Sequence, residues 1–270
     1  MSEIYVSCGA FISKLNGRDY KLLPKWADKF ECDGFEFMMY PDFYDCLGDV
    51  VDCCQGFRIP VFHADKVIGD RVSDPEPQSF DRAKELLEIN LETAEKLGAS
   101  KMVVHCWGIP DSDRELDMIL ERIVRLYEFS LSSGIDMLVE NCVCVHGSPL
   151  SHLEELARMC ENIGLIVDVR CARFHGELKE TMCSSIWRHN VRHVHISDFA
   201  GECGDWTKLR PILLPGCGTV DWAVVRDGLK ENGYRGSFTI ESPSLRKDGT
   251  VDPSLAACAV SYLKEKVLQT

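Results

Sequence analysis

Short apolar segments alternate along the chain with longer amphipathic ones. Eight of the apolar segments are rich in Val, Ile and Phe and are bounded by Gly, Pro or polar residues, a pattern typical of β-strands. These eight predicted strands lie at 3–8, 34–38, 58–63, 101–106, 135–141, 164–169, 191–196 and 236–241.

Helical periodicity occupies several of the intervals between these strands. In 79–97, apolar side chains recur three and four positions apart, and Gly98 follows as a predicted C-cap. Further helices are predicted at 113–132, 151–162, 221–232 and 253–268, the second of these four opening on a capping box of Ser151 and Glu154.

The alternation of strands and helices predicts an α/β protein made of parallel βαβ units. Eight strands fit a closed (β/α)8 TIM barrel better than an open doubly wound sheet, and no Gly-x-Gly-x-x-Gly sequence follows the first strand to indicate dinucleotide binding. Because a barrel takes about 250 residues, residues 1–270 are predicted to form one TIM barrel domain.

The composition of the chain excludes some classes of binding partner and indicates where the protein is located. The formal net charge of −13 argues against broad contact with nucleic acid. No stretch of apolar residues is long enough to span a membrane, and the N-terminus lacks the pattern of a secretory signal. The fourteen cysteines include no Cys-x-x-Cys pair, so we predict a cytoplasmic protein whose cysteines act mostly as small buried apolar residues.

Ionisable residues fall at the ends of four predicted strands. These residues are Glu140, Asp168, His195 and Glu241. In a TIM barrel the carboxyl ends of all strands meet at the catalytic mouth, so the four side chains are predicted to converge there. Three carboxylates and one imidazole suit one divalent cation such as Mn²⁺, Co²⁺, Mg²⁺ or Zn²⁺. The alternative is that each carboxylate makes a separate salt bridge or helix cap at the rim.

Other residues near strand ends are candidates for binding a substrate. His63 and His105 end the third and fourth strands, and Trp107 follows the fourth. In the long segment after the seventh strand, Trp206 has the chemistry to stack on a sugar and Arg210 to bind a carboxylate or phosphate. The alternative for His63 and His105 is that they are structural histidines inside the barrel. The alternative for Trp206 and Arg210 is that they belong to an ordinary solvated loop.

Several short motifs, in this order and spacing, resemble the xylose-isomerase-like TIM barrels. This superfamily contains sugar isomerases, ketose 3-epimerases, inosose-processing enzymes and apurinic-site endonucleases. The resemblance covers nearly the whole chain, and the motifs that carry it are Gly34-Phe-Glu-Phe37, 94–98, 103–108, Leu138-Val-Glu-Asn141, Ile166-Val-Asp168, 193–198, 215–222 and 233–241.

The resemblance implies a divalent-metal-dependent isomerase or epimerase. Glu140, Asp168, His195 and Glu241 would hold a single metal ion, which polarises the carbonyl of a sugar, keto-sugar or cyclitol substrate. Glu140 and Glu241 would move the proton through an enediolate stabilised by the metal. His63 and His105 would bind substrate hydroxyls. Family members are often dimers or tetramers, so the resemblance also implies a possible homo-oligomer.

One position departs from the family pattern. Many members have a histidine three residues after the aspartate of the sixth strand, where this chain has Cys171. Cys171 would line the pocket or ligate a softer metal, and either Arg173 or His175 would supply the missing donor. Three alternatives to an isomerase or epimerase stay open: an inosose-type dehydratase, an apurinic-site endonuclease-like nuclease, and a non-catalytic sugar-binding barrel.

Overall fold

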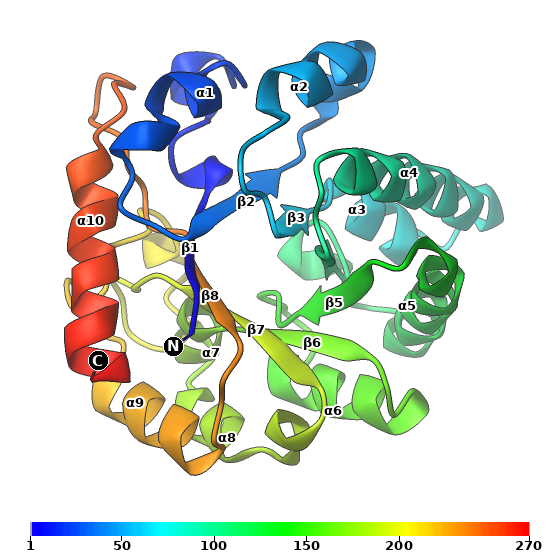
Figure 1. Cartoon of the computed structure of the whole chain (residues 1–270). Helices are drawn as coiled ribbons and strands as arrows, with labels where there is room; N and C mark the ends of the chain where they lie inside the picture. Colours follow the sequence, from blue (N-terminus) through cyan, green and yellow to red (C-terminus); the bar gives the residue numbers. More distant parts are fainter. Residues whose placement is uncertain (1, 270) are drawn as a thin grey trace.

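Eight parallel strands close into a barrel in sequence order, so the predicted (β/α)8 fold is confirmed (Figure 1). The computed structural model describes residues 2–269. The strands are β1 Ile4–Ser7, β2 Gly34–Met38, β3 Val61–His63, β4 Lys101–His105, β5 Asp136–Glu140, β6 Gly164–Asp168, β7 Val191–Ile196 and β8 Ser237–Ile240. Each lies within or coincides with a predicted strand.

The helices form a ring outside the strands (Figure 1). The predicted helices correspond to α4 Pro77–Lys96, α5 Leu116–Ser130, α6 Pro149–Met159, α9 Trp222–Glu231 and α10 Pro253–Tyr262. A π-helical turn, Leu263–Leu268, extends α10. The predicted cap of α6 is wrong: the helix begins earlier, and Ser148 Oγ accepts the amide of Ser151.

Five short helices were not predicted. They are α1 Leu22–Trp26, α2 Leu47–Cys54, α3 Val67–Ser73, α7 Val169–Phe174 and α8 Leu178–Cys183. Each has eight residues or fewer, and two turns or less give too few apolar repeats for a helical stripe to stand out. Helix α7 begins directly after β6, with the Asp168 side chain as its cap on the amide of Cys171.

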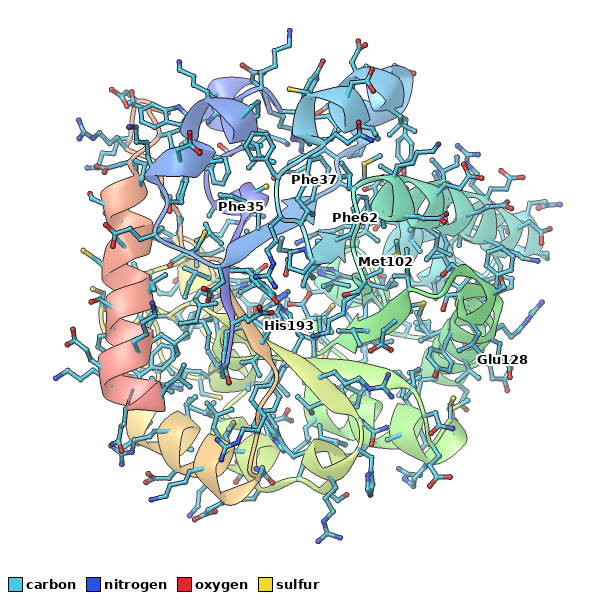
Figure 2. The ribbon with its side chains drawn as sticks, viewed as in Figure 1. Phe35, Phe37, Phe62, Met102, Glu128 and His193 are labelled. Atoms are coloured by element: carbon cyan, nitrogen blue, oxygen red, sulfur yellow. The ribbon has the colours of Figure 1, made fainter. Side chains whose placement is uncertain are left out.

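Side chains along β2 alternate between the layer of surrounding helices and the interior of the barrel. Phe35 and Phe37 point toward the surrounding helices, where Phe37 stacks on Phe62 of β3 (Figure 2). Glu36 lies between them in the sequence, so its side chain points to the opposite side, into the barrel. This carboxylate is fully buried and contacts His193 and His195 of β7, which also face inward.

The interior of the barrel is apolar in its middle layer and polar at one end. An apolar cluster distinct from the main core consists of Tyr5, Val61, Val103, Leu138 and Ile166. Two residues further along the corresponding strands come His63, His105, Glu140 and Asp168. A polar layer therefore lies at the carboxyl ends of the strands, and Glu36 and His193, in register with Val61 and Ile166, extend it into one side of the apolar layer.

The long segment after β7 is held by one buried aspartate. Asp198 Oδ1 accepts the amides of Phe199 and Val220, while Asp198 Oδ2 accepts the amides of Gly216 and Gly218 and the indole N–H of Trp222. A Cβ on Gly218 would lie 2.3 Å from Phe199 O, so the turn requires glycine here. The segment is thus fixed at both of its ends.

The prediction that most cysteines are buried is wrong. Six of the fourteen are buried, four are half-buried and four are exposed. Between residues 2 and 269, the structure contains no helix with the length and apolarity needed to cross a membrane.

Candidate metal centre

The four predicted metal ligands come together at the carboxyl ends of β5 to β8. Glu140 and Asp168 are the last residues of β5 and β6, His195 lies in β7, and Glu241 directly follows β8. One ligand atom from each lies within 4.8 Å of the others. The first three are buried, and the Glu241 side chain is 14% exposed. The group is therefore compact and open to solvent on the side of Glu241.

Glu36 orients the imidazole of this group, and the sequence analysis missed it. Glu36 Oε2 lies 3.1 Å from His195 Nε2, while His195 Nδ1 lies 3.1 Å from Glu140 Oε1. Because Glu36 accepts the Nε2 proton, Nδ1 is the nitrogen that faces the carboxylates of β5 and β8 and would offer its lone pair to a cation bound there. The available signal was a glutamate placed between two phenylalanines inside an apolar strand.

Burial and mutual charge shift the pKa values of the group in opposite directions. Burial raises the pKa of Glu140, but the neighbouring His195 and His105 outweigh it and hold that pKa well below its usual range. Burial and the nearby carboxylates of Glu140 and Asp168 outweigh the lowering effect of His195 and raise the pKa of Glu241 to about 7. Burial opposes protonation of His195, yet Glu36, Glu241 and Glu140 raise its pKa well above the usual value.

A second set of possible ligands shares Glu140. Glu140 Oε2 lies 2.7 Å from His105 Nε2, a hydrogen-bond distance, and 3.6 Å from the buried His63 Nε2, which has no hydrogen-bond partner. His63 Nδ1 lies 2.9 Å from Ala64 O. A proton on Nδ1 satisfies that carbonyl and leaves Nε2 free as an acceptor. The predicted substrate-binding histidines therefore converge on the same carboxylate as His195.

Asp168 is held rigidly by its neighbours. The Asn141 side chain donates to Asp168 O and accepts the amide of Asp168. Asp168 Oδ1 accepts the amide of Cys171 at 2.9 Å, and Oδ2 remains on the side of the other ligands. Burial and the charge on Asp168 raise the pKa of the Cys171 thiol well above its usual value. Cys171 is therefore a neutral, buried thiol beside the group.

A donor that the sequence analysis also missed, Arg170, lies beside Asp168, and its Nη1 donates to Leu209 O at 3.4 Å. Its Nη2 lies 3.9 Å from Asp168 Oδ2, its side chain is 14% exposed, and its Nε is buried without a partner. The two donors predicted to replace the family histidine have contacts elsewhere. Arg173 donates to Thr219 O, and His175 Nε2 accepts the amide of Cys144.

The remaining predicted substrate residues occupy the surrounding loops. Trp107 is buried and donates its indole N–H to Val143 O. Trp206 is 44% exposed and packs edge-on against Phe174, with ring centroids 4.7 Å apart. Arg210 is exposed on the loop after β7.

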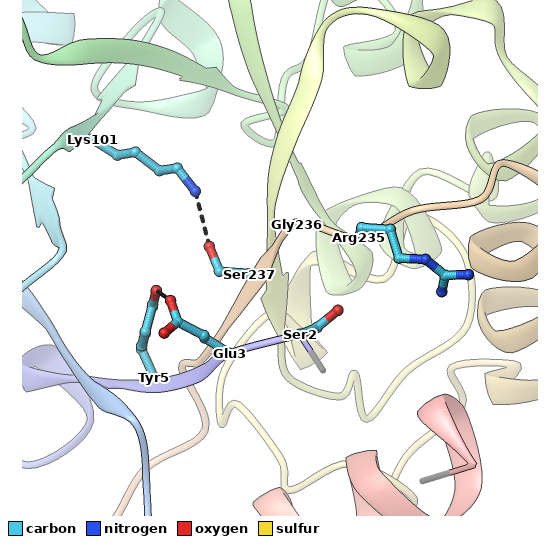
Figure 3. A pocket seen from close by; sticks show the side chains of 7 residues that line it. All are labelled: Ser2, Glu3, Tyr5, Lys101, Arg235, Gly236 and Ser237. Carbon is cyan, nitrogen blue, oxygen red and sulfur yellow. Dashed lines mark hydrogen bonds between the residues drawn. The ribbon is translucent and has the colours of Figure 1, made fainter.

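A separate pocket of about 300 Å³ lies at the opposite end of the barrel (Figure 3). Lys101 and Ser237 are the first residues of β4 and β8, and Lys101 Nζ donates to Ser237 Oγ at 3.1 Å. Glu3 and Tyr5 line the same pocket from the start of β1. Chemistry in TIM barrels occurs at the carboxyl ends of the strands, so we do not assign catalysis to this pocket.

The residues at the mouth fit a divalent cation. Glu36 Oε1 is a buried carboxylate oxygen without a hydrogen-bond partner, which is costly in the absence of a cation. Three further carboxylates, those of Glu140, Asp168 and Glu241, converge at the same end of the barrel. The donor set of three carboxylates and one imidazole matches the ligands of Mn²⁺, Co²⁺ or Zn²⁺. Fold and site together define a TIM barrel with a candidate metal centre at its catalytic mouth.

The family described as xylose isomerase-like TIM barrel matches residues 25–265, and the chain belongs to this family. A structure of the IolI protein with a bound zinc atom is similar over 99% of this chain and 98% of its own, with a TM-score of 0.78 and 16% identity. D-allulose 3-epimerase from Methylomonas sp., in complex with D-allulose, gives a TM-score of 0.73 and 18% identity over 98% of this chain and 97% of its own.

D-psicose 3-epimerase from Clostridium cellulolyticum H10, with D-tagatose, gives a TM-score of 0.69 and 16% identity over 98% of this chain and 99% of its own. At these identities the solved structures show a shared fold. The search of curated proteins found no significant match.

Proposed function

We propose that this protein is a divalent-metal-dependent isomerase or epimerase that acts on a sugar, keto-sugar or cyclitol by proton transfer through an enediolate. The observation that carries the proposal is the convergence of Glu140, Asp168, His195 and Glu241 at the catalytic end of the barrel. The similar folds of sugar 3-epimerases and of the zinc-bound IolI protein support it.

Glu140, Asp168, His195 and Glu241 would hold the cation, with Glu36 fixing the imidazole of His195. When bound, such a cation polarises a substrate carbonyl and makes the neighbouring C–H more acidic. Because the ligands come from four successive strands of a closed barrel, their positions depend on the sheet rather than on mobile loops.

Glu140 and Glu241 are the proposed proton-transfer residues. They come from β5 and just after β8, which two further strands separate in the barrel, so they approach a substrate from different sides. Their surroundings push their pKa values apart, low for Glu140 and about 7 for Glu241. A bound cation would ionise both carboxyls, so their proposed roles rest on their positions in the barrel rather than on this difference.

The other polar groups of the mouth would bind the substrate. His63 presents a buried Nε2 without a partner, His105 Nε2 lies beside Glu140, and Arg170 presents donors beside Asp168. These groups would hydrogen-bond substrate oxygens and fix the reacting carbon near the two glutamates. The neutral thiol of Cys171 would form part of the wall, and Trp107, His175, Trp206 and Arg210 would shape the rim.

Solvent-isotope exchange tests the reaction directly. The Mn²⁺-loaded protein is incubated in D₂O with a panel of ketohexoses, ketopentoses and inososes, and products are examined by NMR and mass spectrometry. We expect one deuterium at the carbon that is reprotonated, which is the carbon that lost its proton in an epimerase and the adjacent carbon in an isomerase. An isomerised product without deuterium would indicate a hydride shift, and loss of water would indicate a dehydratase.

Variants assign the roles of the two glutamates. Glu140→Gln and Glu241→Gln should each reduce turnover by roughly 10²–10⁴-fold, the usual contribution of a positioned acid or base. Glu128→Gln on the outer face of α5 is the matched control and should leave turnover unchanged (Figure 2). Near-normal turnover in either mouth variant would contradict the proposed roles.

The His63, His105 and Glu140 group favours a second candidate function. A second cation at these atoms would share Glu140 with the first, an arrangement suited to phosphate-ester hydrolysis by two metal ions. The net charge of −13 disfavours a nucleic acid substrate. Release of phosphate from small phosphate esters, lost in His105→Ala, would support hydrolysis, whereas deuterium incorporation with no phosphate release would exclude it.

A further inference from the structure

A second cluster of metal-binding side chains lies outside the barrel interior. Asp113 belongs to the segment between β4 and α5, Cys144 to the loop between β5 and α6, and His152 to α6. Each is only 2% exposed, and one ligand atom from each lies within 4.8 Å of the other two. None of the three contributes to the candidate metal centre described above.

Backbone contacts bring the two loops together at this cluster. The Asp113 carboxylate accepts the amide of Val145 at 3.2 Å and the amide of His146 at 2.7 Å. Cys144 Sγ lies 3.2 Å from Gly147 O. Both contacts hold the carboxylate and the thiol on the same side of the loop, facing α6.

The imidazole of His152 packs closely between Gly147 and the ring of Trp107. A Cβ on Gly147 would lie 2.3 Å from His152 Nε2, so the loop needs glycine to admit the ring. Trp107 meets the same ring edge-on, with centroids 5.2 Å apart and an interplanar angle of 89°. The ring is therefore positioned by two loops at once.

His152 lacks the hydrogen bonds that a buried imidazole normally has. Its Nδ1 is buried and has no partner. Burial lowers the pKa of His152, so the ring is neutral and one nitrogen carries a free lone pair. Burial and the neighbouring Asp113 raise the pKa of Cys144 to about 12, so the thiol stays protonated when no cation is near. A cation would give the unpaired nitrogen of His152 a partner and would replace the proton that the Cys144 thiol donates to Gly147 O.

We propose that Asp113, Cys144 and His152 form a second metal site that binds Zn²⁺ or a similar borderline-soft divalent ion. Thiolate, imidazole and carboxylate are the ligand types of zinc, whereas Mg²⁺ and Ca²⁺ prefer oxygen ligands alone. The fourth position of a tetrahedral ion is left for water. As the metal–sulfur bond forms, the Cys144 S–H bond breaks and its proton leaves to solvent, with no change of oxidation state.

A metal ion at this site would cross-link two loop segments beside the catalytic mouth. It joins the segment after β4 to the loop after β5, and these follow the strands that carry His105 and Glu140. The proposal does not depend on the proposed isomerase or epimerase activity.

Cobalt substitution separates this site from the barrel centre. Co²⁺ bound to a thiolate gives a charge-transfer absorption in the near ultraviolet, and the four ligands at the barrel centre include no sulfur. The full-length His195→Ala variant, stripped with a chelator and reloaded with Co²⁺, should still show this absorption. The double variants His195→Ala/Cys144→Ser and His195→Ala/His152→Gln should lose it, while His195→Ala/Cys171→Ala, the matched control, should retain it.

Zinc affinity gives a second readout that does not rely on spectra. Competition with a chromophoric chelator should show a loss of roughly a hundredfold or more for Cys144→Ser in the His195→Ala background. Circular dichroism checks that each variant is folded. Absence of the thiolate absorption in folded His195→Ala protein, or its loss with Cys171→Ala instead of Cys144→Ser, would overturn the proposal.

Discussion

At the scale of single residues, the candidate metal centre depends on how one carboxylate directs one imidazole. Glu36 has no ligand role in the four-residue group, yet it determines which nitrogen of His195 faces Glu140 and Glu241. Its own position follows from the alternation of β2, which places it inside the barrel between two outward phenylalanines.

We expect Glu36→Gln to weaken Mn²⁺ binding by roughly 10–100-fold, because a neutral amide accepts the Nε2 proton of His195 less strongly and leaves its tautomer undefined. Titration calorimetry with Mn²⁺ measures the change. Glu128→Gln, the exposed control on α5, should bind Mn²⁺ as the unmodified protein does. Equal affinity in Glu36→Gln would contradict the positioning role.

Protonation of the ligands makes metal binding pH-dependent. The pKa of Glu241 is raised to about 7, so this carboxyl keeps its proton below pH 7 and must release it to a cation. We expect the Mn²⁺ affinity to fall as the pH drops from 7 to 5, about tenfold per unit for each proton released. The raised pKa of His195 adds to the same trend.

Glu241→Gln provides the test, because it removes one of the protons that metal binding displaces. The affinity of this variant should be lower at pH 7 but should depend on pH less steeply. Calorimetry in two buffers of different ionisation enthalpy counts the released protons. An unchanged proton count would show that Glu241 is already ionised before binding.

At the scale of elements, Asp198 determines the path of the segment after β7. Five donors depend on its two oxygens, and three of them, the amides of Phe199 and Val220 and the indole of Trp222, are buried. Removal of a buried acceptor leaves buried donors unsatisfied at a cost of about 1–3 kcal/mol each. In Asp198→Asn, the side-chain NH₂ group replaces one carboxylate oxygen, so the donors that faced this oxygen lose their acceptor. We expect the free energy of unfolding to fall by about 3 kcal/mol or more, measured by urea denaturation.

Asp221→Asn is the matched control for Asp198. Asp221 is exposed and caps α9 by accepting the amides of Ala223 and Val224. Asparagine caps helices about as well as aspartate, so stability should change little. If both variants lost the same small amount, the buried hydrogen bonds of Asp198 would not hold the segment as proposed.

The strands and longer helices could be predicted because their patterns are local. An apolar run such as Leu165–Val167 or the stripe of α4 can be recognised within a few residues. The four proposed ligands could be predicted for the same reason, since each lies at a strand end and a closed barrel brings strand ends together. The short helices α1 and α7 offered no comparable repeat.

Other parts of the site depend on tertiary structure and were missed. Glu36 was missed because its role depends on which strand lies opposite across the barrel. Arg170 was missed because the direction of its side chain depends on a helix of six residues. The cluster of Asp113, Cys144 and His152 joins two irregular segments whose paths no sequence period encodes.

At the scale of the whole molecule, the barrel concentrates carboxylates at one end of an already acidic chain. The net charge is −13, and four of the carboxylates, including the fully buried Glu36, lie around the candidate metal centre. Burial and the neighbouring Glu140 and Asp168 destabilise the ionised form of Glu241 and raise its pKa, and a cation bound to the folded state would remove this cost. Binding to the folded state alone stabilises it by about 2.7 kcal/mol when the free ion is at 100 times its Kd.

We therefore expect Mn²⁺ at that concentration to raise the Tm of the stripped protein by roughly 5–10 °C, given about 2–4 °C per kcal/mol for a chain of this size. Mn²⁺ is the suitable probe because its preference for oxygen ligands directs it to the barrel centre rather than to Cys144. His195→Ala should lose most of the shift. Na⁺ at equal ionic strength should not reproduce it, because screening alone leaves the buried carboxylates without a ligand. A Tm that responds equally to Na⁺ and Mn²⁺ would mean that the carboxylates repel one another without forming a metal centre.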